Sequence, residues 1–244
     1  MKLKPIILSV LGAVLFITGI LIGLGVSAAY AWAESEAYVF STYNADGNLH
    51  LKCPVLLSPN ESGLVTGNIV NVIDRNIKPQ VSSQISHPGL PLKAEQTVEL
   101  VVGESKTLEW TVSASDNQFN RLILVNVIQS HYQNNPSYVG SCGILLFSLF
   151  GLNGNQTLIL LFVASLVAMI SGGLILLLMQ VRPMDNYAVN LTRICSVLMG
   201  MAILALFGVL PRLWVLTIFL DALVLLIAGV IFTDFILFPQ KYKD

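Results

Sequence analysis

Charged residues are scarce in this sequence. Only 11% of its 244 residues are Asp, Glu, Lys or Arg, against about a quarter in soluble globular domains, while 55% are hydrophobic. This composition excludes an ordinary soluble domain. The net charge is −1, and Lys and Arg form no cluster, so the basic surface that nucleic-acid binding needs is missing. We therefore predict an integral membrane protein that does not bind nucleic acid.

Cysteine and histidine are also scarce, with three residues of each. Three cysteines do not make a disulfide scaffold. His50 and Cys53 lie three residues apart in an expected strand, where such residues point to opposite faces, so we do not expect them to bind one metal ion. No histidine lies in a long apolar run, which excludes haem held by paired histidines within the membrane. We predict no metal and no cofactor.

Catalytic motifs are missing as well. The stretches "GLVTG" and "GVSAA" are not nucleophile elbows, and "VGESK" lacks the spacing of a phosphate-binding loop. We therefore predict that the protein is not an enzyme.

Long apolar runs, by contrast, are abundant. An uncharged stretch over residues 5–33 exceeds the roughly 20 residues that cross a bilayer. It is also longer than the apolar region of a signal peptide, about 7–15 residues, so we favour a retained anchor over a cleaved signal although "AWA" imitates a cleavage site. Three further runs follow within 157–238. We predict four transmembrane helices, over residues 1–33, about 157–181, 194–211 and 213–238.

The basic residues near the ends of these runs predict the orientation of the chain. They fall on one side of the membrane if both termini are cytoplasmic, and they are Lys2, Lys4, Arg182, Arg193, Lys241 and Lys243. Among the short connections only Arg212 falls on the other side. We therefore predict a multi-pass protein of the cell membrane, with residues 34–156 outside and a cytoplasmic tail at 239–244.

Residues 141–156 contain an apolar core, Ile144–Leu152, that is too short to cross the bilayer. A fifth span here would place the two basic termini on opposite sides of the membrane. We therefore predict that this segment is interfacial or re-entrant and lies at the outer leaflet.

The stretch over residues 34–140 is expected to form an extracytoplasmic all-β domain. Short runs such as "TVELVV" and "KTLEWTVSAS" alternate apolar and polar residues, and turn-forming stretches such as "NADGN" and "SPNESG" separate them. In the second run Leu108, Trp110 and Val112 share one face, which favours Trp110 in the core over an exposed stacking site. This pattern is similar to small immunoglobulin-like or fibronectin-like sandwiches.

Cys53 and Cys142 both fall in the part predicted to lie outside, where thiols oxidise, whereas Cys195 does not. A disulfide between the first two would close a loop of about 90 residues and stabilise the domain by about 4–5 kcal/mol in the chain-entropy model. The sequence does not supply the Cα separation that a bridge needs, so two separate buried thiols stay an alternative.

Small residues at a spacing of four predict close helix packing. They are Gly19 and Gly23 in the first run and Ala164, Ala168 and Gly172 in the second. Packing within one chain and contact with another subunit are both consistent with this pattern.

Asp221 is the most unusual residue of the last run. At a rise of 1.5 Å per residue it lies about 12 Å beyond Leu213, where an ion costs roughly 2.5–3.5 kcal/mol on insertion scales. Ser165 lies at a similar depth in the second run and offers a hydrogen bond. We predict that Asp221 is an intramembrane polar docking point, satisfied by Ser165 or by a partner's helix. A proton relay is the alternative.

Together these features predict a structural or accessory subunit of a membrane protein assembly. Its partners would be other membrane subunits or copies of itself, and the lipid bilayer. The alternative is a subunit of a transporter or electron-transfer complex in which Asp221 is a polar or proton-handling residue.

Overall fold

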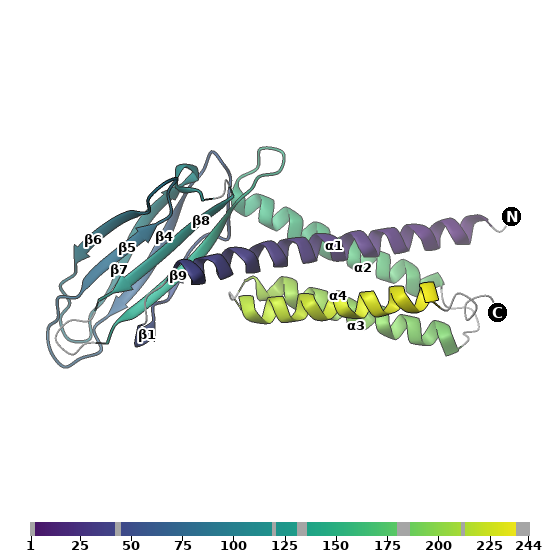
Figure 1. Ribbon diagram of the computed structural model, residues 1–244. Helices are drawn as coiled ribbons and strands as arrows, with labels where there is room; N and C mark the ends of the chain where they lie inside the picture. Colours follow the sequence, from purple (N-terminus) through teal and green to yellow (C-terminus); the bar gives the residue numbers. More distant parts are fainter. Residues whose placement is uncertain are drawn as a thin grey trace. The chain divides into compact units, whose positions relative to one another are not determined.

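The computed structural model describes residues 3–41, 45–118, 121–130, 136–179, 186–210 and 213–237 (Figure 1). The chain divides into two units, a helical unit of Met1–Ala31 and Ile159–Asp244 and a β unit of Trp32–Leu158. The predicted tail at 239–244 lies outside the described residues, as do the side chains of the six basic residues that predicted the orientation.

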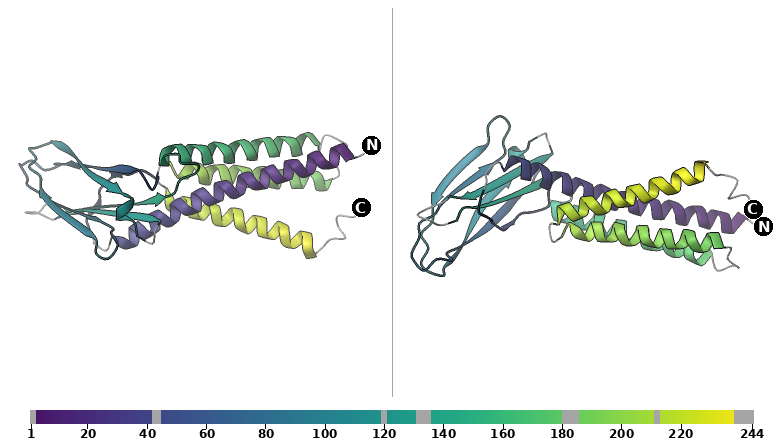
Figure 2. Two further views of the ribbon diagram at one scale, coloured as in Figure 1. Left: turned by 90° about the horizontal axis from the view of Figure 1, so that it is seen from above. Right: turned by 60° about the horizontal axis from the view of Figure 1, so that its bottom comes forward.

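Four helices are described. They are α1 (Leu3–Phe40), α2 (Gly154–Met179), α3 (Asn186–Gly208) and α4 (Trp214–Leu237). Within the helical unit they run alongside one another, as the two views of Figure 2 show. Two of them contain a described stretch that is long and apolar enough to cross a membrane, Val10–Phe40 in α1 and Gly154–Leu178 in α2.

The prediction of four transmembrane helices is wrong for α3 and α4. The apolar part of α3 within the described side chains is Cys195–Gly208, which at 1.5 Å per residue measures about 21 Å. The sequence before it contains polar residues such as Asn190 and Arg193. The apolar part of α4 within the described residues is Trp214–Val230, about 26 Å long. Both are shorter than the roughly 30 Å of bilayer hydrocarbon.

The β unit contains two sheets that pack as a sandwich. One has the strand order β1-β9-β8-β5-β6, with β3 also paired to β9, and the other has the order β2-β4-β7. Neighbouring strands are antiparallel, except that β1 and β3 run parallel to β9. The strands are β1 (Gly47–Asn48), β2 (Leu51–Lys52), β3 (Leu56–Leu57), β4 (Ser62–Val70), β5 (Gln80–Ile85), β6 (Leu92–Thr97), β7 (Ser105–Ser113), β8 (Leu122–Gln129) and β9 (Tyr138–Leu146).

In the second sheet, buried and exposed residues alternate along the strand, and the buried ones form its core face. In β7, Leu108, Trp110 and Val112 are buried, and the residues between them are exposed. Trp110 is 8% exposed and belongs to the main apolar cluster, so its predicted core position is confirmed. A sandwich-like β part is therefore present, as the alternation predicted.

Strand β9 extends into residues 141–156. These residues form the second half of β9, a turn and the first turn of α2, and their interfacial location stays a prediction. Cys142 and Ile144 face the apolar core of the sandwich, with no exposed surface. On the other face, a Cβ at Gly143 would stand 2.0 Å from the carbonyl oxygen of Ala33, so α1 lies directly against the strand.

The last turns of α1 belong to the β unit. Ala33 and Ala37 are buried against Leu122 and Leu124 of β8, and together they form a second apolar cluster. The helix therefore continues to Phe40, past the end of the anchor predicted at residue 33, because these small side chains fit against the sheet.

Candidate functional site

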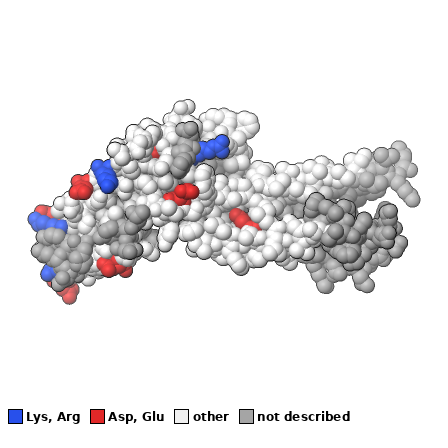
Figure 3. All heavy atoms as spheres, in the orientation of Figure 1, with Lys and Arg blue, Asp and Glu red and all other residues white. Residues whose placement is uncertain are grey.

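Asp221 is the only charged side chain that the structure describes in the helical unit. In Figure 3 the coloured charged side chains gather over the β unit, and the described helix surface in this view is almost entirely white. Asp221 is 7% exposed, and a buried carboxyl needs a hydrogen-bond partner to offset the loss of water. Asp221 and its hydrogen-bond partner therefore form the candidate polar site of the helical unit.

That partner is Ser27 of α1, which has no exposed surface. Its Oγ donates toward Asp221 of α4 and lies 2.9 Å from each carboxyl oxygen. It also lies 3.0 Å from the carbonyl oxygen of Gly23, one turn earlier. Because a serine hydroxyl carries one proton, it donates to one of these oxygens at a time. Ser27 therefore joins α1 to α4 through a buried polar contact.

Ser165 is not the partner of Asp221 that the sequence predicted. It is buried in α2, and its Oγ donates to the carbonyl oxygen of Gly19 in α1, at 2.8 Å. Ser165 thus bonds to the backbone of α1, whereas Ser27 bonds to Asp221 of α4. The signal for Ser27 was present in the sequence, since it continues the four-residue spacing of Gly19 and Gly23.

The predicted glycines lie where α1 and α2 approach most closely. A Cβ at Gly19 would stand 2.5 Å from the backbone nitrogen of Met169, and one at Gly172 would stand 2.4 Å from that of Phe16. At Gly23 a Cβ would stand 2.9 Å from Ser165 Oγ. The small-residue faces are therefore used within the chain, between these two helices.

Ala164 and Ala168 lie at the side of this contact rather than at its centre. Both are half-buried, whereas Ser165 and Met169, one residue further along α2, are fully buried. The contact face of α2 thus runs through Ser165, Met169 and Gly172 rather than through the two alanines.

The other two helices pack against the same region. Met169 of α2, Leu198 and Ala202 of α3 and Val224 of α4 form one apolar cluster. A Cβ at Gly208 of α3 would stand 2.7 Å from Thr217 Oγ1, which donates to the carbonyl oxygen of Leu213 within α4. Apolar side chains thus pack close to the Ser27–Asp221 pair along α4.

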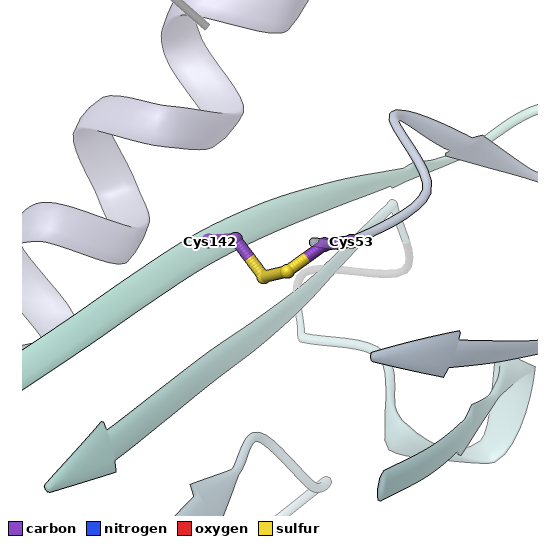
Figure 4. The surroundings of a disulfide bond; sticks show 2 residues. All are labelled: Cys53 and Cys142. Carbon is purple, nitrogen blue, oxygen red and sulfur yellow. A yellow bond between two sulfur atoms is a disulfide. The ribbon is translucent and has the colours of Figure 1, made fainter. Parts of the chain in front are cut away.

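In the β unit the structure joins Cys53 and Cys142 by a disulfide (Figure 4). Their Cα atoms are 6.6 Å apart and the residues are separated by 89 positions. Cys142 lies on β9 and is fully buried, while Cys53 lies on the connection after β2. Cys195 of α3 is a free thiol, half-buried.

Metal-ligating side chains do not gather anywhere in the described part of the chain, where no three His, Cys, Asp or Glu residues are close enough to hold an ion. Cys53 is occupied by the disulfide, and His50 is exposed. His87 Nδ1 lies 3.8 Å from Asp116 Oδ1, at the edge of an ion pair. On the surface, Lys78 donates a hydrogen bond to Glu99 and lowers the pKa of that carboxyl.

Comparison with known proteins identifies no family. No family model and no curated protein matches this chain. Among solved structures, a cycloisomaltooligosaccharide glucanotransferase from Paenibacillus sp. is similar at 18% identity and a TM-score of 0.35, covering 44% of this chain and 15% of the enzyme. A β-glucuronidase from Bacteroides uniformis is similar at 14% identity and a TM-score of 0.32, covering 41% of this chain and 13% of the enzyme.

A CARDB domain from Pyrococcus furiosus is similar at 16% identity and a TM-score of 0.32, covering 41% of this chain and 93% of that domain. The chain spans less than a sixth of the two enzymes above. Likenesses at these TM-scores carry no function, and the immunoglobulin-like class of the sandwich stays a prediction.

Proposed function

We propose that this protein is a non-enzymatic structural or accessory subunit of a membrane assembly, and that it holds its β unit at the membrane surface for contact with a partner. The observation that carries this proposal is the Ser27–Asp221 pair. The only charged side chain described in the helical unit is buried and is satisfied by a neighbouring helix of the same chain. A polar group used in this way contributes to helix association and specifies which helices are neighbours.

The contacts of α1 support a role in holding helices together. Its glycines accommodate the backbone of α2, and its Ser27 binds α4. Close backbone approach and buried hydrogen bonds between helices are the main sources of helix association in lipid. These contacts support the proposal that the helices form a rigid membrane-bound unit that carries the β unit.

The membrane location rests on α1 and α2, each of which has a stretch long and apolar enough to cross. Because two crossings return a chain to the side where it began, this proposal places both termini in the cytoplasm and residues 34–156 outside. The distribution of lysine and arginine supports that orientation. The disulfide supports it as well, since disulfides persist in oxidising compartments.

The sandwich supplies surfaces for a partner. Among the described strands, β6 ends one sheet and β7 ends the other, and β6 is exposed along its whole length. Open strand edges are a common means of binding a further chain, through main-chain hydrogen bonds. We infer that the partner is another membrane subunit or a second copy of this chain.

The test is purification of the tagged full-length protein in a mild detergent, followed by mass spectrometry of the intact complex. We expect a stoichiometric partner or a defined homo-oligomer. Lysine substitutions at the edges, Ala94→Lys on β6 and Thr107→Lys on β7, probe which edge binds, and one of them should reduce recovery of the partner. Asn68→Lys on β4 is the matched control, because this exposed residue lies on the middle strand of its sheet. A monomer with no enriched companion in every mild detergent would contradict the proposal.

A further inference from the structure

The turn between β9 and α2 exposes aromatic side chains to an unusual degree. Phe150 is 92% exposed and Phe147 is 46% exposed. Phe150 has a φ of 53°, in the left-handed region that favours glycine or asparagine over an aromatic residue. The chain therefore carries two unfavourable features at one position, backbone strain and an apolar ring outside the core.

This turn is held in place by hydrogen bonds rather than left loose. The backbone N–H of Phe147 donates to the carbonyl oxygen of Leu57, and that of Leu152 donates to Leu149, at 3.0 and 2.9 Å. Asn153 caps α2, because its side chain accepts from the N–H of Gln156 at 2.8 Å. The N–H of Gly154 donates to Glu61 Oε2 at 2.7 Å. Phe150 is thus presented in a defined position.

The turn directly precedes α2, whose stretch Gly154–Leu178 is long and apolar enough to cross a membrane. It therefore lies at the end of that helix, where a membrane surface would be. Aromatic side chains concentrate at this depth, where an apolar ring is in contact with lipid and polar groups with water.

Trp32 of α1 is a second indication that this part of the β unit lies at a membrane surface. It is 42% exposed, and the residue after it, Ala33, packs against Gly143 of β9. The indole N–H donates to Glu36 Oε1 at 3.2 Å, one turn closer to the C-terminal end of α1. The ring is therefore oriented with its polar edge toward the sandwich, as interfacial tryptophans are oriented toward water.

We propose that Phe147 and Phe150, together with Trp32, form an aromatic anchor that inserts into the headgroup region of the bilayer and fixes the depth of the sandwich at the membrane surface. The partner is lipid. Insertion explains why an aromatic residue occupies the left-handed position of Phe150, because the bilayer offers the ring an apolar environment that water does not. This proposal rests on the membrane location proposed above.

The test uses the full-length protein in phosphatidylcholine vesicles, with a fluorophore on one introduced cysteine in a Cys195→Ser background. The probe sites are Ser148→Cys in the turn, Leu90→Cys on an exposed loop of the sandwich, and Val167→Cys on the exposed side of α2. Quenching by lipids labelled near the headgroup or at the tail end reports depth. We expect headgroup-level quenching at position 148, tail-level quenching at 167 and none at 90.

Phe150→Asn separates lipid contact from folding. Asparagine fits the left-handed backbone, so the fold in detergent should be kept, while quenching at position 148 should fall. Leu90→Asn is the matched control and should leave that quenching unchanged. Quenching at 167 without quenching at 148 would overturn the anchor and leave the membrane location intact. Lack of quenching at 167 would overturn both. If position 148 is shielded from water in native membranes but is not quenched in lipid vesicles, a protein rather than lipid covers it. That outcome would overturn the lipid anchor.

Discussion

At the scale of single residues, the pair Ser27 and Asp221 makes the sharpest prediction. Ser27→Ala leaves a buried carboxyl without its hydroxyl partner, whereas Asp221→Leu removes the interhelical bond and leaves the Ser27 hydroxyl to donate to the carbonyl oxygen of Gly23. We expect each to lower the free energy of unfolding by about 1–3 kcal/mol. The double variant should lose clearly less than the sum, because after Ser27→Ala the second change removes a carboxyl that is already unpaired. Thermal unfolding in detergent measures these losses.

Two further variants control this experiment. Asp221→Asn keeps an acceptor oxygen in place and should retain most of the stability. Ser35→Ala removes an exposed hydroxyl of the same helix, whose bond goes to the backbone of Trp32, and should have little effect. Strictly additive losses in the double variant would show that the two residues do not interact.

Sequence reasoning identified Asp221 but not its partner. A carboxylic acid in an apolar run is conspicuous by itself, since it has an energetic cost wherever it is placed. Its partner depends on which helices are neighbours, and depth estimates from run ends do not contain that information. Ser165 and Ser27 were both available, and packing of α1 between its neighbours decided between them.

At the scale of secondary-structure elements, the contact between α1 and α2 predicts opposite effects for two glycines of one helix. A Cβ at Gly19 would collide with the backbone of Met169, which cannot move without displacing α2. At Gly25 a Cβ would meet nothing within 4 Å. Gly25→Ala should therefore be neutral or stabilise by up to about 1 kcal/mol, through helix propensity. Gly19→Ala should lower the melting temperature of the helical unit, as circular dichroism would measure. Equal effects of the two substitutions would contradict this packing.

The element that sequence reasoning missed was β9. Its residues face the sandwich core on one side and α1 on the other, so polar residues do not alternate with apolar ones. A strand buried on both faces resembles a short apolar run without period, and length alone does not distinguish it from other apolar segments. Strand β7, which is exposed on one face, shows the alternation and was predicted correctly.

At the scale of the whole molecule, the disulfide lies entirely within the β unit. Reduction should therefore destabilise the sheets by about 2–5 kcal/mol and leave the helical unit unaffected. Infrared spectroscopy follows the sheet and helix bands separately during heating, and we expect only the sheet transition to move to lower temperature. Cys195→Ser, which removes a free thiol, should move neither. A common shift of both bands would mean that the two units unfold together.

The position of β9 in the sheet also has a consequence for biosynthesis. This strand is the last of the β unit to be made, yet β1, β3 and β8 all pair with it. At roughly 5–20 residues per second, a ribosome needs about 4–18 seconds to proceed from Cys53 to Cys142. During that interval β1 and β3 have no strand to pair with, and the thiol of Cys53 has no disulfide partner. Under the orientation proposed above, the nascent chain would therefore depend on the chaperones and thiol oxidoreductases at the exit of its translocation channel.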